Sequence, residues 1–241
     1  PTEGGLPEPT SLEVPGEARR IASVLGGCLY TLAIVDADPN ECGELIQALS
    51  ETGADRLALI RAPTCAGPCT WATRGDALIA AAERIKPNLV MLAADARGRD
   101  IAPRMAARLG GAYFAEPAVH YGPHGEVVLS RTTFGGTHRE RVAADELDVA
   151  AVVTLTPGSY RPALGRDDAE VLSISVDVEP TQVVYVDSTD DPDADLDDAQ
   201  IVVTAGGGCD EAAFELVQQL ADALGGQSAV TRSSVEAGRG S

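Results

Sequence analysis

The alternation of apolar, strand-like segments with helical patterns between residues 28 and 111 constrains the fold of this chain most strongly. The strand-like segments are CLYTLAIVDAD (28–38), ADRLALIRAP (54–63) and LVMLAAD (89–95). The helical patterns between and after them are ECGELIQALSETG (41–53), GDALIAAAERIKPN (75–88) and GRDIAPRMAARLGG (98–111). This order is typical of a parallel sheet covered by helices. We therefore predict an α/β fold with a doubly wound, mostly parallel sheet.

Residues with known preferences for helix ends support these assignments. Asp36, Asp38 and Asn40 are candidate N-caps for the helix predicted over 41–53. Gly53 and Gly110 stand where a helix commonly ends in a left-handed residue. Strand and helix therefore alternate with plausible boundaries.

The pattern changes after Gly111 to short alternating segments. Residues 115–136 predict a hairpin, and residues 149–160 predict one further long strand. A β-rich segment is thus expected to close the first domain.

Composition shifts divide the chain into four parts. Residues 1–17 are rich in Pro and Gly and lack apolar periodicity, which predicts a flexible, extended arm. The first α/β domain is expected over 18–186 and a solvated acidic linker over 187–198. Residues 199–241 contain a strand, a Gly-rich turn, a helix and a strand, which predict the start of a second α/β domain.

The net charge of −19 and the sequence pI near 4.4 weigh against two classes of partner. Such a chain repels phosphate backbones and anionic lipid, so we expect neither nucleic acid nor a membrane surface as a partner. No apolar run is long enough for a membrane helix, and the first residues do not resemble a signal peptide. We expect no membrane insertion and a cytoplasmic location.

Motifs for metal binding and catalysis are weak. Cys65 and Cys69 are separated by three residues, unlike redox pairs and most zinc sites, and their role stays open. The aspartates of the linker lack the Gly and Glu of a calcium loop. No histidine has an evident nucleophile partner, and the hydrolase and kinase motifs are absent. We predict no metal site and no catalytic residue.

The strongest local signal is the segment IVVTAGGGCDEAAFELVQQL (201–220), in which Gly206, Gly207 and Gly208 join a strand to a helix. Exposed backbone amides at such a turn can hold a phosphate or pyrophosphate. The segment matches neither the dinucleotide fingerprint nor the phosphate-binding loop, and similar turns occur without a ligand. From these residues alone, both a nucleotide site and a ligand-free turn remain open.

Three segments, in order along the chain, resemble the alpha subunit family of the electron transfer flavoproteins. They are LVMLAADARGRDIAPRMAARLGGAYFAE (89–116), VAAVVTLTPGSYRPA (149–163) and the Gly-rich turn, helix and Thr-Arg strand over 194–238. The resemblance implies a first domain that is Rossmann-like, or adenine nucleotide alpha hydrolase-like. It also implies the start of a second, flavin-type α/β domain, C-terminally shortened relative to the family.

The same resemblance implies an electron carrier rather than a catalyst with its own substrate. Its cofactor would be FAD, its partner a beta-type subunit in which AMP is possible, and its redox partners dehydrogenases or quinone reductases. Gly206, Gly207 and Gly208 would contact FAD. Thr231 and Arg232 stand at the family's Ser-Arg position, where the arginine lies beside the isoalloxazine and stabilises the negative charge of the reduced flavin. Gly207 departs from the arginine that the family usually carries in its turn.

Two alternatives remain open beside this interpretation. One is a scaffold without FAD, in which the flavin domain has become a docking module. The other is an adenine-nucleotide-binding protein without redox chemistry, using the three glycines for phosphate.

Overall fold

The computed structural model describes residues 2–3, 6–7, 12–35, 42–62, 69–144, 149–162, 165, 169–176, 183, 196 and 199–238. The chain divides into two compact units, Pro1–Tyr185 and Val186–Ser241, and each is described by itself. Among the described residues, no helix has the length and apolar character needed to cross a membrane.

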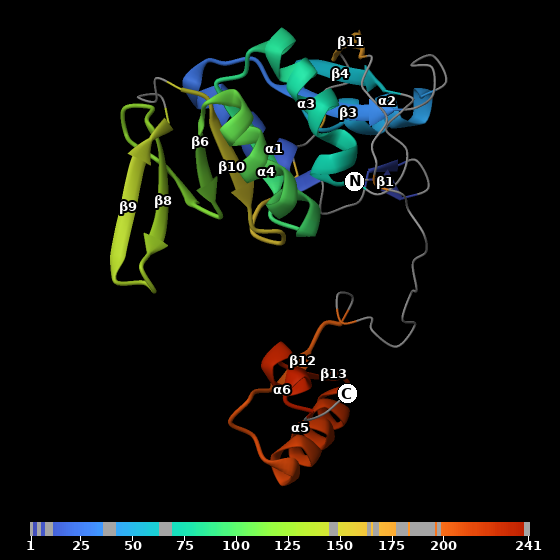
Figure 1. Ribbon diagram of the computed structural model, residues 1–241, viewed down its shortest axis with the longest axis vertical. Helices are drawn as coiled ribbons and strands as arrows, with labels where there is room; N and C mark the ends of the chain where they lie inside the picture. The colour runs from blue at the N-terminus through green and yellow to red at the C-terminus, as the bar shows by residue number, and fades with distance from the viewer. Residues whose placement is uncertain are drawn as a thin grey trace. The chain divides into compact units, whose positions relative to one another are not determined.

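The first unit contains two three-stranded parallel sheets (Figure 1). In one, β4 (Arg56–Arg61) lies between β3 (Tyr30–Val35) and β11 (Glu170–Ser175). In the other, β10 (Ala151–Leu155) lies between β5 (Leu89–Ala93) and β6 (Ala112–Ala115). The predicted α/β fold with a mostly parallel sheet is confirmed.

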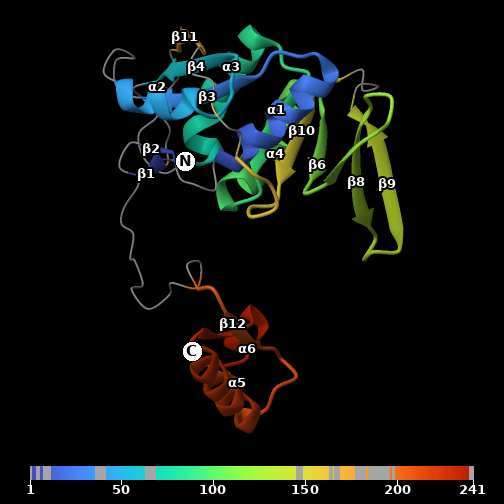
Figure 2. The same ribbon diagram turned by 180° about the vertical axis from the view of Figure 1, so that it is seen from behind.

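The strand β4 shows why the sheet needs cover on both faces. Leu57 packs against Ala18 of α1 (Glu13–Leu25) and Leu49 of α2 (Gly43–Ser50). The neighbouring residues Ala58 and Ile60 belong to the opposite face and pack against α3 (Trp71–Ile85). Because successive strand residues point to opposite faces, this continuous apolar strand requires helices on both sides. Figures 1 and 2 show the two faces of this arrangement.

The strand β10 is covered by a helix on one face and by a second sheet on the other. Val152 packs against Ala102 and Ala106 of α4 (Ala96–Leu109). Val153 belongs to a cluster with Leu129 of the antiparallel sheet. That sheet has the order β7-β8-β9, formed by Ala118–Tyr121, Val127–Thr133 and His138–Ala143.

The N-terminal arm is shorter than predicted. The extended arm was expected through Glu17, but α1 begins at Glu13, and Glu17 is 2% exposed. Pro15 lies in the first turn of this helix, where the missing N–H has no intrahelical acceptor. Before it, β1 (Thr2–Glu3) pairs antiparallel with β2 (Leu6–Pro7).

The predicted helix ends are partly confirmed. Gly110 caps α4 in the left-handed conformation, with φ of 63°. Gly53 is also left-handed, with φ of 77°, but it follows the C-cap Glu51 of α2 rather than forming the cap. The N-caps expected at 36, 38 and 40 lie outside the described residues.

The β-rich segment after Gly111 is more extensive than a hairpin and one strand. The hairpin is present as β7 and β8, but β9 adds a third strand. The long strand expected over 149–160 is the shorter β10, inserted between β5 and β6. The sequence HRERVA did not suggest β9, because its charged residues hide the alternation of an edge strand.

The second unit contains one strand-helix-strand element followed by a short helix. The strand β12 (Val202–Ala205) pairs in parallel with β13 (Gln227–Val230), and α5 (Glu211–Leu224) connects them. The helix α6 (Arg232–Glu236) follows β13. This is the strand, Gly-rich turn, helix and strand order predicted for residues 199–241.

Candidate functional site

The carboxyl ends of β12 and β13 bring the two predicted site segments together. The strand β12 leads into Gly206, and β13 leads into Thr231. The Thr231 N–H donates a hydrogen bond of 3.0 Å to the Ala205 carbonyl oxygen, which extends the parallel ladder to the edge of the sheet. In open parallel sheets, ligands bind at this edge.

The three glycines of the turn have no steric requirement for glycine within the described part of the unit. A Cβ at Gly206 or Gly208 would meet no atom within 4 Å, and one at Gly207 would lie 3.7 Å from Ser233 Oγ. None of the three has a positive φ in the left-handed range. Glycine loses more backbone entropy on folding than any other residue, so three in succession need an explanation. Close approach of a ligand to the backbone of the turn would provide one.

Glycines elsewhere in the molecule do have steric causes. A Cβ at Gly98 would lie 1.8 Å from the Ala93 carbonyl oxygen. A Cβ at Gly226 would lie 2.5 Å from the Ile201 carbonyl oxygen. These two glycines permit close packing between helix ends and strands, whereas the turn at 206–208 leaves open space.

The carboxylate of Asp210 caps the N-terminus of α5. Asp210 is the N-cap, and its side chain accepts a hydrogen bond of 3.0 Å from the Ala213 N–H. The Cys209 N–H closes the preceding turn on the Gly206 carbonyl oxygen at 3.0 Å. A phosphate against the first turn of α5 would be repelled by Asp210, so the open glycine turn is the better place for an anion.

Hydroxyl groups gather near the turn, at the start of α6. Thr231 Oγ1 lies 3.1 Å from Ser233 Oγ and 3.1 Å from Ser234 Oγ. Ser234 is fully buried, which fixes this cluster against the unit. The group offers donors and acceptors for phosphate or hydroxyl groups of a nucleotide.

Arg232 is the cation of this site. Its side chain is 91% exposed and its Nε donates a hydrogen bond of 2.8 Å to Glu236 Oε1, one turn later on α6. An exposed pair of this kind contributes little to stability. The guanidinium therefore stays available to a bound anionic group.

The site contains residues that the sequence prediction omitted. Asp210, Ser233 and Ser234 were not selected, although an Asp directly before a helix and hydroxyls at a helix start are common capping signals.

Cys65 lies outside the described residues. The described residues contain no group of three or more potential metal ligands.

This arrangement fits a dinucleotide cofactor. The open glycine turn, the hydroxyl cluster and Arg232 supply amide, hydroxyl and guanidinium donors at one edge of a parallel sheet. The fold and the site thus define an α/β protein of the nucleotide-binding class.

Comparison with known families gives the particular protein family. Residues 2–179 match the electron transfer flavoprotein domain, and residues 195–240 match the electron transfer flavoprotein FAD-binding domain. The chain belongs to the electron transfer flavoprotein alpha family. It is an alpha-like subunit of this family, and the family assignment supports FAD as its cofactor.

Individual relatives agree with this assignment. The chain is 27% identical over 240 residues to electron transfer flavoprotein subunit alpha of Thermoanaerobacterium thermosaccharolyticum, covering 95% of this chain and 70% of the relative. It is 31% identical over 246 residues to protein FixB of Clostridium saccharobutylicum, with coverages of 98% and 71%. It is 28% identical over 243 residues to the alpha subunit of Mycobacterium leprae, with coverages of 98% and 72%. Proteins of this family work with beta subunits and dehydrogenases.

Proposed function

We propose that this chain relays electrons from a dehydrogenase to an acceptor through FAD, together with a beta-type subunit. The observation that carries the proposal is the meeting of the open glycine turn with Thr231 and Arg232 at one sheet edge. In this proposal, residues 18–186 provide the partner contacts, 187–198 form a linker, and residues 199–241 contribute to the FAD site.

The chain's own residues would bind and orient the cofactor. FAD, when bound, supplies the capacity to accept and donate electrons. The amides of Gly206, Gly207 and Gly208 would hold an anionic part of it, and the Thr231 hydroxyl would accept or donate a hydrogen bond. Arg232 would place a positive charge beside the flavin, which favours the more negative, reduced form.

Absorbance spectroscopy tests the cofactor and the partner together. The chain is purified alone and after co-expression with the beta-type subunit of the same organism, and released cofactor is identified by mass spectrometry. A flavin spectrum in the co-expressed sample is the expected result. Colourless protein in both samples would instead support a scaffold without FAD, and an adenine nucleotide without flavin would support the non-redox alternative.

Substitution at the turn tests the site itself. Gly207→Ala adds a methyl group whose nearest described atom would be Ser233 Oγ at 3.7 Å, so we expect the unit to fold and the flavin content to fall. Gly43→Ala in α2 is the control, because its Cβ meets no atom within 4 Å and it lies outside the proposed site. Equal flavin content in the two variants would contradict this placement.

Substitution of the cation tests its role. Arg232→Ala should lower the reduction potential of the bound flavin, and Arg232→Lys should restore part of the shift, because a nearby positive charge stabilises the reduced form. Arg84→Ala on α3 is the matched control. An unchanged potential in Arg232→Ala would remove this residue from the proposed site.

A further inference from the structure

The helices on the two faces of the parallel sheets in the first unit differ in charge. The helices α3 and α4, which pack against each other through Ile79 and Met105, carry six arginines and three carboxylates, a net charge of +3. The helices α1 and α2 carry two arginines and three glutamates, a net charge of −1. In a chain with a net charge of −19, the positive charge of α3 and α4 needs a physical cause.

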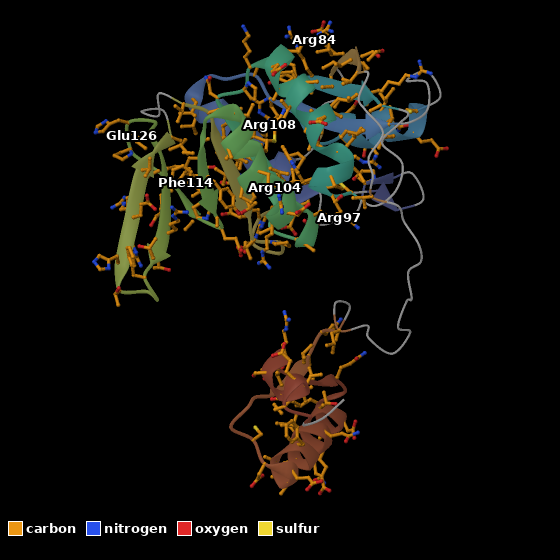
Figure 3. All side chains as sticks on the ribbon, viewed as in Figure 1. Arg84, Arg97, Arg104, Arg108, Phe114 and Glu126 are labelled. Carbon is orange, nitrogen blue, oxygen red and sulfur yellow. The ribbon has the colours of Figure 1, made fainter. Side chains whose placement is uncertain are left out.

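The arginines of α4 form a stripe along the helix. Arg97, Arg104 and Arg108 are separated by seven and four residues, a spacing that places them on one side of an α-helix. The stripe runs beside α3, because Arg108 Nη1 lies 3.7 Å from Asp76 Oδ1 of that helix. Figure 3 shows these arginines together with Arg84, which lies in the last turn of α3.

The carboxylate nearest to this stripe is engaged within the fold. Asp100 Oδ2 accepts a hydrogen bond of 2.7 Å from the Trp71 N–H at the start of α3, and Asp100 Oδ1 accepts one from Arg104 Nη1. Arg104 Nη1 also donates to the Asp100 carbonyl oxygen at 2.6 Å. Asp100 thereby orients Arg104, whose side chain stays 54% exposed. Since a guanidinium has five N–H donors, Arg104 keeps donors for a partner.

The other cations of this surface are weakly engaged. The contact of Arg108 with Asp76 is too long for a hydrogen bond, and both side chains are more than half exposed. Arg84 is exposed and has no ion-pair partner among the described residues. A cation in the last turn stabilises a helix dipole, which accounts for one charge at the end of each helix but not for Arg104. We call Arg84, Arg104 and Arg108 the arginine face.

The arginine face lacks a large apolar anchor. Along α3 and α4, which the structure describes in full, no large apolar side chain is exposed. Elsewhere in the first unit such side chains are exposed, as at Val24, Tyr121 and Phe134. Permanent subunit interfaces bury apolar surface, whereas transient complexes rely more on polar contacts and on steering by charge. The arginine face therefore fits a partner that binds and dissociates.

The remaining charge of the chain decides which anionic partner fits. A nucleic acid or an anionic membrane extends far beyond one pair of helices and would be repelled by the carboxylates around it. A folded protein can present carboxylates at the contact alone, and its other charges are screened beyond about 8 Å at physiological salt. A two-fold contact with a second copy would place arginines against arginines. These arguments favour a different protein with clustered surface carboxylates.

We propose that the arginine face is a transient docking surface for the dehydrogenase that donates electrons to this protein. Carboxylates on that enzyme would pair with Arg84, Arg104 and Arg108. An electron relay has to meet its donor and release it in every cycle, which a polar, steered contact permits. This inference rests on the proposed function for the existence of a donor dehydrogenase, and it adds the surface and the chemistry of the contact.

The test measures how fast the donor dehydrogenase of the same organism reduces FAD in the chain assembled with its beta-type subunit. The double variant Arg84→Glu with Arg108→Glu should lower kcat/KM for the dehydrogenase about tenfold, because reversed charges oppose the encounter. The loss should lie in KM, with kcat nearly unchanged, because docking and not chemistry is altered. The double variant Arg84→Lys with Arg108→Lys keeps both charges and should retain most of the rate.

Arg161→Glu is the charge-matched control. Arg161 is exposed and follows Tyr160, which packs with Val153 on the face of β10 opposite to α4. This variant should stay within about twofold of the unaltered protein. Added salt should slow reduction of the unaltered protein and of Arg161→Glu, and the reversed double variant should lose most of this dependence. The fluorescence of Trp71 shows whether each variant remains folded under the assay conditions.

The outcomes separate this inference from the proposed function. If no dehydrogenase reduces the unaltered complex, both are overturned. If reduction occurs and the reversed double variant matches Arg161→Glu, only the docking surface is overturned. If that double variant no longer co-purifies with the beta-type subunit, or is slowed only in passing electrons to the acceptor, the assignment to the dehydrogenase is wrong. A fall in kcat with an unchanged KM would also overturn docking as the role of these arginines.

Discussion

The segments β5-α4-β6 and β12-α5-β13 begin from the same local signals and reach very different degrees of burial. Both helices have an aspartate N-cap, Asp95 in α4 and Asp210 in α5. Both end in a left-handed glycine, Gly110 and Gly225. Local sequence therefore specifies a strand-helix-strand segment twice. The two strands pair directly in β12-α5-β13, whereas β10 lies between β5 and β6, and the difference in burial arises from what packs around each segment.

The first unit buries large apolar side chains, and the second buries small ones. Leu57 and Val152 are fully buried in the first unit. In the described part of the second, the buried residues are Ala205, Ala221 and Ser234, whereas Leu216 is 64% exposed and Leu220 is 51% exposed. Since apolar burial drives folding, the first unit is expected to be the more stable of the two in the free chain.

The largest loss of stability is expected from a cavity in the core of the first unit, and it tests the difference in burial between the two units. Leu57→Ala should lower the free energy of unfolding by about 3 kcal/mol, because the side chain is fully buried among α1 and α2. Leu216→Ala in α5 is the counterpart and should change stability by no more than about 0.5 kcal/mol.

The readouts for these two variants can be kept separate. Trp71 is the single tryptophan of the chain and lies in α3, so its fluorescence in a denaturant titration reports the first unit. Hydrogen exchange of the α5 amides reports the second. Both readouts can be expressed as a loss of unfolding free energy. If Leu216→Ala costs as much by α5 hydrogen exchange as Leu57→Ala costs by the Trp71 transition, the difference in burial between the units is contradicted.

A buried carboxylate in the first unit gives the next largest effect. Glu17 accepts hydrogen bonds from the Tyr121 hydroxyl and, at 2.7 Å, from Arg20 Nη1. It thereby joins α1 to β7. Glu17→Ala should cost about 2 kcal/mol, because it removes the acceptor for both groups.

Two controls sharpen the result for Glu17. Glu17→Gln keeps an acceptor oxygen and should cost less than Glu17→Ala. Glu83→Ala, at an exposed position of α3, should leave the Trp71 transition within about 0.5 kcal/mol. Equal losses for the alanine variants at 17 and 83 would show that the buried network contributes nothing.

The parallel core could be predicted from sequence because its strands are continuous apolar runs. LALI in β4 and LVML in β5 are typical of strands covered on both faces. By contrast, β9 and β11 were missed because HRERVA and EVLSIS mix exposed and core positions. The helix over 13–25 was missed because Pro15 and Gly16 resemble loop residues, and only tertiary packing of Glu17 and Ile21 reveals their helical place.

The candidate site could be predicted in outline but not in its electrostatics. Gly206, Gly207, Gly208, Thr231 and Arg232 were selected from a strand-to-helix turn and a family resemblance. Their proximity depends on the parallel pairing of Ala205 with Val230, a long-range contact that sequence patterns imply but do not specify. The occupation of the α5 N-terminus by a carboxylate required coordinates.

The matched N-caps provide a smaller test of the comparison. Asp95 accepts from the Gly98 N–H at 2.7 Å, and Asp210 accepts from the Ala213 N–H at 3.0 Å. Asp95→Ala and Asp210→Ala should each remove about 1 kcal/mol of helix stabilisation.

The two cap variants should lose stability in different units, and different measurements should report the two losses. Asp95→Ala should shift the Trp71 transition, and Asp210→Ala should raise hydrogen exchange in α5 without moving that transition. If Asp210→Ala also shifts the Trp71 transition, the units unfold together, and the comparison between independent units fails.

The smallest effect is expected at alkaline pH and concerns the first unit. Burial, followed by the hydrogen bond to Glu17, raises the pKa of Tyr121, and burial followed by the charge of Glu17 raises the pKa of Tyr160. A raised tyrosine pKa means that the neutral side chain is favoured in the folded state. Its contribution to the free energy of unfolding is therefore full below the pKa of tyrosine in the unfolded chain, near 10. That contribution is lost as the pH rises from there through the pKa in the folded chain. The unaltered chain should therefore lose stability above about pH 10 more steeply than Tyr121→Phe. Denaturant midpoints from Trp71 fluorescence, compared at about pH 8 and pH 10.5, should show a smaller difference in stability between the two proteins at the higher pH. An unchanged difference would mean that Tyr121 ionises equally in the folded and unfolded chains, and a larger one would mean that folding lowers its pKa.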